Sequence, residues 1–273
     1  MPHVISMEAE DILDQSFNVL DRGFVRLIDY MGSDQRIVAA ARVSYGKGTK
    51  SIREDQGLIN YLMRNLHTSP FEQVVLTFHV KLPIFVARQW VRHRTARLNE
   101  ISGRYSIMSD EFYEPEPNEI RTQSKVNKQG SSSVRLPDAI TNWASDAIKK
   151  NGKNIYKNLY KEAIDKDIAR EMARIILPLN LYTEWYWQID LHNLFHFLKL
   201  RLDAHAQYEI REYAKVVAMI THKVAPMAYA AFEKYYLGGE SFSKESIEWL
   251  KNNIDFDNND LPKEIRDKLF RHE

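Results

Sequence analysis

Cysteine is absent from the 273-residue sequence, and its absence rules out several kinds of chemistry. Without thiols the chain can form no disulfide, no thiolate metal site, no iron–sulfur cluster and no cysteine nucleophile. The sequence also has no apolar run of membrane-spanning length, and its N-terminus lacks the pattern of a secretory signal. We therefore expect a cytoplasmic protein with no membrane partner.

An excess of charge of one sign is also missing. Lys and Arg number 38 and Asp and Glu 37, which gives a net charge of +1. A dedicated nucleic-acid-binding module is usually basic over a whole face, so we expect no nucleic-acid partner. The sequence also contains neither a GxGxxG nor a Walker A motif, which argues against a Rossmann or P-loop nucleotide site.

One short segment departs from this balance. Residues 92–106 carry four arginines, no lysine and a single acid, Glu100. Arginine grips phosphate or carboxylate with two parallel hydrogen bonds. Ser102-Gly103-Arg104 adds hydroxyl and backbone N–H donors on a turn, as an anion-binding nest does. We predict an anion site here. The alternatives are a solvated surface face and a nucleic-acid contact, whose affinity would fall steeply with salt.

Hydrophobic periodicity predicts the elements. Strands are expected at 23–30, 74–82 and 181–190, of which 74–82 would be buried on both faces. Helices are expected at 33–44, capped by Ser33-Asp34, and at 54–66, 84–94, 137–166 with a break at Asn151-Gly152, 167–177, 191–202, 206–224 and 226–237.

The order of these elements is not a regular βαβ alternation, which predicts an α+β fold. We expect a single domain at 1–240, with a central, mostly antiparallel sheet flanked by helices. Residues 115–137 are rich in turn-forming residues and predict a loop insertion. Residues 241–273 are charged and amphipathic, and predict a C-terminal helical extension.

Two histidines have metal-ligand spacing. His192 and His196 stand at i and i+4, and His205 would be a third ligand. The Glu that follows the first His in a zinc-protease helix is missing. We favour histidines that pack at a ligand edge or at a subunit contact and expect no metal, with a metal-dependent nucleotide hydrolase as the alternative.

The pattern Arg92-His93-Arg94, seven residues, then Ser102 resembles the signature of the flavin-dependent thymidylate synthases. The similarity covers about residues 22–237. Further segments match the family in type and order: Ala40–Ser44, His67–Glu72, Phe85–Trp90, Ala173–Asn180 and Arg201–Gln207.

The resemblance implies a homotetramer with active sites shared between subunits. It implies a methyltransferase of dTMP biosynthesis that converts dUMP to dTMP, with methylenetetrahydrofolate as carbon donor. FAD, reduced by NADPH, would supply the hydride. The other kind of thymidylate synthase adds a cysteine thiolate to the pyrimidine, and a chain without Cys must activate the base in another way. A cation that polarises the ring is consistent with this.

Residue roles are implied in the same way. Arg201 matches the catalytic arginine that stabilises the ionised pyrimidine, and His67 a histidine near the flavin ring. The implied dUMP site comprises Gln89, Arg92, Glu100, Ser102, Gly103, Arg104, Arg174 and Arg201. The implied FAD site comprises Ser44, Ser69, Glu72, Arg92, His93, Arg94, Thr95, Glu100, Asp190, His192 and His196.

Two positions depart from the family pattern. Arg97 stands where the family often has Ser, and Asp190-Leu191-His192 stands where it often has Asn-x-Arg. Because His192 stands in place of this Arg, the hydrogen-bond donor at the flavin would have a charge that depends on pH instead of a permanent charge.

Overall fold

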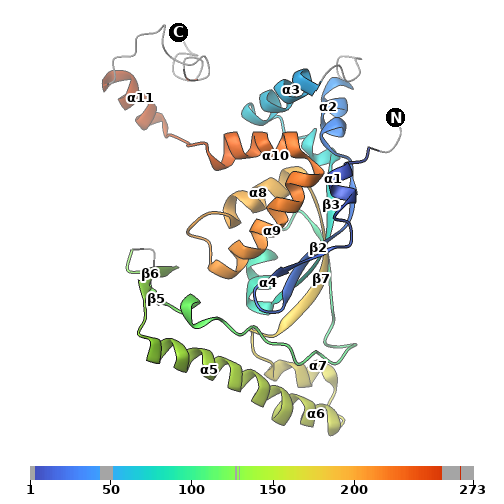
Figure 1. Ribbon diagram of the computed structural model, residues 1–273, viewed down its shortest axis with the longest axis vertical. Coiled ribbons are helices and arrows are strands. Elements are labelled where there is room, and N and C mark those ends of the chain that lie inside the picture. The colour runs from blue at the N-terminus through green and yellow to red at the C-terminus, as the bar shows by residue number, and fades with distance from the viewer. Residues whose placement is uncertain (1–3, 44–51, 127, 129, 254–264, 266–273) are drawn as a thin grey trace.

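The computed structural model describes residues 4–43, 52–126, 128, 130–253 and 265. At its centre lies a five-stranded sheet in which every neighbouring pair of strands is antiparallel (Figure 1). The strands, in spatial order, are β1 (Ser16–Val19), β2 (Gly23–Met31), β3 (Val75–Pro83), β7 (Tyr182–Asp190) and β4 (Arg97–Glu100). The predicted α+β domain with an antiparallel sheet is therefore confirmed.

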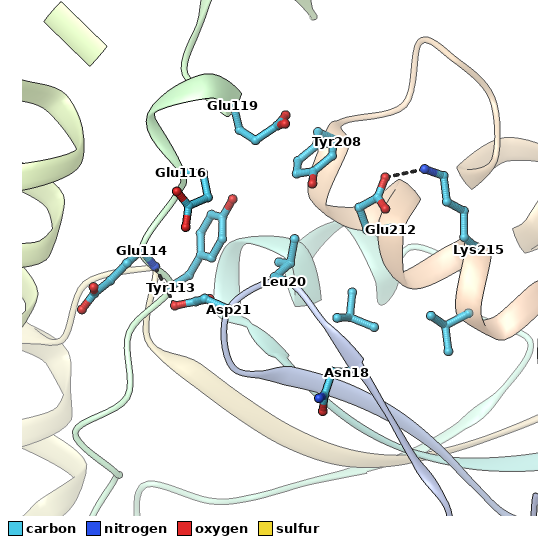
Figure 2. A pocket seen from close by; sticks show the side chains of 12 residues that line it. Asn18, Leu20, Asp21, Tyr113, Glu114, Glu116, Glu119, Tyr208, Glu212 and Lys215 are labelled. Carbon is cyan, nitrogen blue, oxygen red and sulfur yellow. Dashed lines mark hydrogen bonds and ion pairs between the residues drawn. The ribbon is translucent and has the colours of Figure 1, made fainter. Parts of the chain in front are cut away.

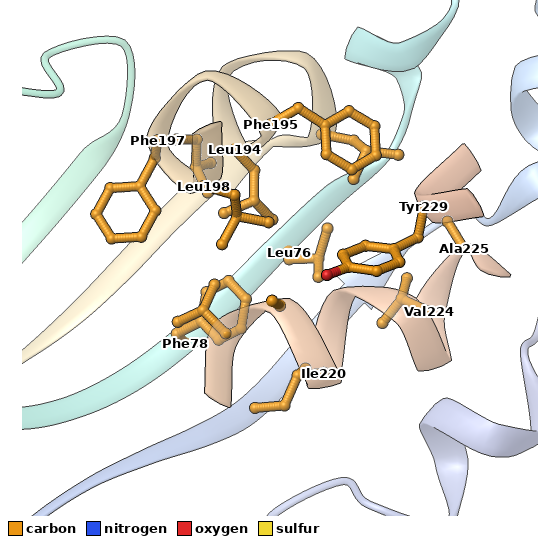
Figure 3. Close-up of a cluster of buried hydrophobic side chains, with 14 of the residues drawn as sticks. Leu76, Phe78, Leu194, Phe195, Phe197, Leu198, Ile220, Val224, Ala225 and Tyr229 are labelled. Carbon is orange, nitrogen blue, oxygen red and sulfur yellow. The ribbon is translucent and has the colours of Figure 1, made fainter. Parts of the chain in front are cut away.

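Helices α8 (Leu191–Arg201), α9 (Tyr208–Val224) and α10 (Pro226–Phe232) cover one face of this sheet (Figure 1). Leu76 and Phe78 of β3 point into that layer, toward Leu194 of α8 and Ile220 of α9 (Figure 3). The alternate β3 side chains are only half-buried. The prediction that this strand is buried on both faces is wrong, because helices in the described chain cover one face only.

The remaining helices of the main body are α1 (Met7–Glu10), α2 (Asp34–Arg42), α3 (Ile52–Arg64), α4 (Ile84–Trp90) and a π-helical turn at Glu233–Leu237 that continues α10. The predicted helices 33–44, 54–66, 191–202, 206–224 and 226–237 are confirmed within a few residues. The predicted helix 84–94 is too long, since α4 ends at Trp90.

Asp34 does not cap its own helix as predicted. Ser33 holds the N-cap position of α2 without a side-chain cap hydrogen bond. The buried Asp34 carboxylate instead accepts from the backbone N–H groups of Met227, at 2.8 Å, and Ala228, at 2.9 Å. Asp34 therefore caps α10, and burial raises the pKa of its carboxyl to about 6.

Helix α5 (Asp138–Ile155) lies at the other end of the molecule (Figure 1). A second, smaller cluster of buried side chains includes Phe112, against which this helix packs. Its buried members are Met108, Phe112, Tyr160, Ala173 and Leu181. The predicted break at Asn151-Gly152 is wrong, because α5 runs through it. A Cβ on Gly152 would lie 2.9 Å from the Phe112 ring, so this glycine permits close packing instead of ending the helix.

Beyond α5 follow a π-helical segment (Tyr156–Tyr160), α6 (Lys161–Asp165), α7 (Arg170–Ala173) and a 3-10 turn (Arg174–Ile176), so the predicted helix 167–177 is much shorter than expected. The predicted loop at 115–137 contains a 3-10 turn (Pro117–Glu119) and a two-stranded antiparallel sheet of β5 (Arg121–Gln123) and β6 (Ser131–Arg135). Helix α11 (Lys244–Asn253) contains no buried residue and extends away from the body (Figure 1). The domain boundary at 240 stays a prediction.

Candidate functional site

The arginine-rich segment leaves α4 and forms the edge strand β4. Helix α4 ends at Trp90, whose fully buried ring packs against Trp185, Trp187 and Phe197. The chain then turns outward, and β4 pairs with β7 so that Arg97 lies opposite Gln188 and all four β4 residues are exposed. The arginines are therefore displayed on the rim of the sheet.

A cavity of about 280 Å³ opens between this segment, the end of β7 and α8. Its lining contains three arginines and no carboxylate, so it suits an anionic ligand. The lining residues are Arg92, His93, Arg94, Thr95, Ile189, Asn193, His196, Leu200 and Arg201. The predicted cation-rich site thus brings together side chains from distant parts of the sequence.

Arg201 is held from two sides in this cavity. Its Nε donates to Nε2 of His93 at 3.1 Å, and its Nη2 donates to the Gln89 carbonyl at 3.3 Å. Burial, together with the charge of Arg201 and of His196, lowers the pKa of His93 to about 4. His93 is therefore neutral at pH 7 and accepts the hydrogen bond. Within the described chain Nη1 of Arg201 has no partner, so it remains available to a ligand.

Other predicted substrate residues form a second group beyond β4. Ser102 Oγ accepts from the Arg104 N–H at 3.2 Å, which closes the predicted turn. Arg104 also forms an exposed ion pair with Glu171 at 3.4 Å. A Cβ on the buried Gly103 would lie 3.1 Å from Cδ of Arg174. The Ser102-Gly103-Arg104 turn thus packs against Arg174, as two groups that bind one anion together would have to. Neither the turn nor Arg174 lines the arginine-lined cavity.

The third group lies where α8 begins. Ser69 lies just before the 3-10 turn Phe71–Gln73 and Glu72 lies within it, and both residues are exposed. The backbone N–H of Leu191, the first residue of α8, donates to the carbonyl of Val74, which follows this turn, at 2.8 Å. This hydrogen bond connects the turn to α8. Asp190, predicted to bind flavin, accepts from the Asn193 backbone at 3.0 Å and from its side chain at 2.8 Å. Asp190 is therefore the N-cap of α8.

Four further predicted residues are placed as follows. His192 lines a separate narrow cavity with Thr68 and Phe71 instead of the arginine cavity. His67 is exposed, with its ring edge-on to Tyr61 at 5.7 Å. The Gln89 side-chain amide is hydrogen-bonded to Gln207. Ser44 lies outside the described residues.

Three residues that line the cavity were not predicted from the sequence. Asn193 and Leu200 line it beside His196 and Arg201, and Ile189 closes the β7 end. The α8 members stand at i, i+3, i+7 and i+8, so they share one face of the helix. That spacing would have identified Asn193 and Leu200.

The geometry gives no support to the hydrolase alternative. His205 lies on the loop after α8, where Nδ1 is 2.9 Å from Asp203. Among the described residues no three His, Asp or Glu side chains are grouped as metal ligands would be. In the same part of the chain, no helix is long and apolar enough to span a membrane.

A larger cavity of about 330 Å³ lies on another side, between the β1–β2 turn, residues 113–119 and α9 (Figure 2). Its lining includes five carboxylates, those of Asp21, Glu114, Glu116, Glu119 and Glu212. These carboxylates would repel a phosphate, so the smaller, arginine-lined cavity is the better site for an anionic nucleotide.

Comparisons with known proteins agree with this chemistry. Residues 26–227 match the family model described as "Thymidylate synthase complementing protein". The flavin-dependent thymidylate synthase of Treponema denticola is 61% identical over 242 residues, covering 89% of this chain and 91% of that protein. The enzyme of the same name from Thermus thermophilus is 58% identical over 233 residues, covering 85% and 84%.

Solved structures resemble the fold as well. The UMP/dUMP methylase PolB from Streptomyces cacaoi, bound with 5-Br UMP, superposes with a TM-score of 0.70 at 32% identity, covering 78% of this chain and 95% of that chain. Its complex with 5-Br dUMP gives a TM-score of 0.70 at 31% identity, covering 81% and 98%. With the family-model match and the identity to the enzymes above, these similarities show that the chain belongs to the flavin-dependent thymidylate synthases, a family of methyltransferases.

Proposed function

We propose that this chain converts dUMP to dTMP, with methylenetetrahydrofolate as carbon donor, bound FAD as cofactor and NADPH as reductant. The observation that carries the proposal is the arginine-lined cavity in which neutral His93 holds the guanidinium of Arg201. A preorganised cation of this kind stabilises negative charge that develops during a reaction.

The cavity residues fit a flavin dinucleotide chemically. Arg92 and Arg94 would hold the diphosphate, and Thr95 and Asn193 add neutral hydrogen-bonding groups. The cavity of about 280 Å³ is at the lower end for small-molecule sites, so one chain would enclose only part of the dinucleotide. When bound, FAD supplies the hydride.

Base activation would fall to Arg201. The sequence contains no cysteine, so no thiolate of this chain can add to the pyrimidine. Nη1 of Arg201 would instead stabilise the charge that develops on the ring, while His93 and the Gln89 carbonyl keep the guanidinium in place. Because His93 is neutral, it adds no second positive charge at this point.

The nucleotide phosphate would bind at the Ser102-Gly103-Arg104 turn and Arg174. Backbone N–H groups and two guanidinium groups suit a dianion there. Support also comes from PolB, a 32% identical neighbour whose complexes hold brominated UMP and dUMP.

We propose a homotetramer with shared active sites, acting in the cytoplasm, and a catalytic domain at 1–240. Three observations support shared sites: the arginine cavity includes neither the Ser102-Gly103-Arg104 turn nor Arg174, β4 has β7 as its single strand neighbour in the described chain, and apolar side chains near these residues are exposed. The exposed side chains are Leu98, Ile101, Tyr105, Met172, Ile175 and Leu179. A second copy would cover them and bring the groups together.

The test is flavin content and turnover of the purified protein. We expect a yellow protein whose flavin absorbance is bleached by NADPH without oxygen. It should release tritium from C5-labelled dUMP when NADPH and methylenetetrahydrofolate are present. A colourless protein that takes up no added FAD would overturn the proposal, as would flavin-loaded protein without tritium release.

A further inference from the structure

Thr183 is a buried hydroxyl with a charged partner. It lies on β7, where its residue is only 2% exposed. Its Oγ1 donates to Oε1 of Glu100 across 2.6 Å. This length is typical of a hydroxyl bound to an ionised carboxylate, which is about twice as strong as a neutral hydrogen bond. A hydroxyl buried at this position without its partner would be costly, so the contact explains why threonine is tolerated in the core.

Glu100 is the sole acid of residues 92–106, which otherwise carry four arginines. An exposed carboxylate near several guanidinium groups would be expected to pair with one of them and neutralise it. In the described chain Glu100 forms no ion pair, and Thr183 is its side-chain partner. Among the described residues, the Thr183 hydroxyl and not a guanidinium group therefore holds the Glu100 carboxylate.

The backbone around Glu100 is fixed by the sheet. Glu100 lies opposite Trp185 in the β4–β7 ladder, and the next N–H, that of Ile101, donates to the Glu184 carbonyl at 2.9 Å. The ladder sets the position of the Glu100 Cα, but it leaves the side chain free to rotate. The Thr183 hydroxyl removes that freedom, and Oε2 remains to accept from a ligand.

We propose that Thr183 is a positioning residue for nucleotide binding. Its hydroxyl fixes the Glu100 carboxylate so that Oε2 can accept a hydrogen bond from the nucleotide. This inference rests on the proposed function and on the place in the dUMP site that the family resemblance implies for Glu100.

The experiment compares three variants. Thr183→Val has nearly the same shape without the hydroxyl, and Thr183→Ser keeps the hydroxyl. Thr221→Val is the matched control, because Thr221 is also fully buried and donates to Val217 at 2.7 Å within α9, away from the cavity. Tritium release gives kcat and KM, calorimetry gives the Kd for dUMP, and thermal melts report stability.

For Thr183→Val we expect a rise of about tenfold in KM and Kd for dUMP, with kcat within about twofold of the wild type. Thr183→Ser should restore both constants. Thr221→Val should lower the melting temperature without changing KM. An active wild type with an unchanged KM in Thr183→Val overturns this inference alone, and so does an equal rise of KM in Thr221→Val. A wild type without flavin or tritium release overturns the proposed function itself.

Discussion

Nε of Arg201 donates to Nε2 of His93 across 3.1 Å, which joins the last residue of α8 to the turn after α4. The bond exists only while that nitrogen of His93 is unprotonated, since a protonated imidazole has no acceptor. Burial and the adjacent guanidinium ensure this by lowering the pKa of His93 to about 4. The hydrogen bond to Arg201 therefore requires a neutral His93, and the charge of Arg201 in turn helps to keep His93 neutral.

This pairing predicts a dependence of stability on pH. The unfolded chain takes up a proton on His93 near its ordinary pKa of 6.5, whereas the folded chain does so only near 4. Between these values the unfolded state binds more protons, so the contribution of His93 to stability is lost as pH falls from about 6.5 to 4. His93→Gln keeps an acceptor but does not titrate. Its melting temperature should fall less between pH 7 and pH 5 than that of the wild type. The exposed His205→Gln is the control, and parallel curves for His93→Gln and wild type would contradict the prediction.

Arg201→Ala should separate binding from turnover. Arg201 would compensate charge that develops during the reaction, so its loss should reduce kcat about 10²–10³-fold while flavin content and most dUMP affinity remain. Single-turnover tritium release and calorimetry measure the two effects. Arg211→Ala, which removes a guanidinium bonded to Ala204 outside the cavity, should leave kcat near the wild-type value. Unchanged turnover in Arg201→Ala would refute the role.

The buried carboxyl of Asp34 should make stability depend on pH in the direction opposite to His93. Burial raises the pKa of its carboxyl from an ordinary 3.8 to about 6, so its contribution to stability is greatest at low pH and is lost as pH rises from about 4 to 6. The change amounts to about 3 kcal/mol. Asp34→Asn keeps an acceptor for α10 without the titration, so its free energy of unfolding relative to the wild type should increase over this range. Urea denaturation at pH 4, 5, 6 and 7 tests this, and a difference independent of pH would rule it out.

Two glycines should respond to alanine in opposite ways. A Cβ on Gly23 would lie 1.9 Å from Oη of the buried Tyr213 and 2.8 Å from the Lys81 carbonyl, so Gly23→Ala should destabilise by about 3 kcal/mol. A Cβ on Gly57, which is exposed in α3, meets nothing within 4 Å. Gly57→Ala should therefore stabilise by about 0.5–1 kcal/mol. Denaturant unfolding of both variants measures the two changes in the free energy of unfolding. Changes of the same sign and size would contradict the prediction.

Elements with strong periodicity were predictable from the sequence, and those defined by distant partners were not. Strand β7 and helix α8 show clear alternation and helical spacing, and both were predicted within one residue. Strand β4 (Arg97–Glu100) was missed because it is short, exposed and without alternation, and its hydrogen bonds come from β7 much later in the chain. The small β5–β6 sheet was missed for the same reason of length.

The candidate site was also predictable from the sequence only in part. The sequence indicated that distant arginines complete the 92–106 segment, and Arg201 does reach its cavity. Arg174 does not reach this cavity but packs against Gly103 of the same segment, and Asp190 caps α8 because the backbone N–H of Asn193 lies within hydrogen-bond distance of its carboxylate. The contacts that these side chains make depend on three-dimensional geometry, which the spacing of residues along the sequence does not reveal. The roles assigned to these residues stay predictions.

The strand order also has a consequence for how this protein is made. Strand β3 lies at the centre of the sheet, yet its partner β7 is synthesised roughly a hundred residues later, a delay of about 5–20 seconds at usual translation rates. During this interval β1, β2 and β3 have emerged with the edge of β3 unpaired, and the helices that bury Leu76 and Phe78 do not yet exist. An unpaired apolar edge invites association with other chains. The newborn chain is therefore most vulnerable to aggregation before β7 emerges, and most in need of a chaperone then.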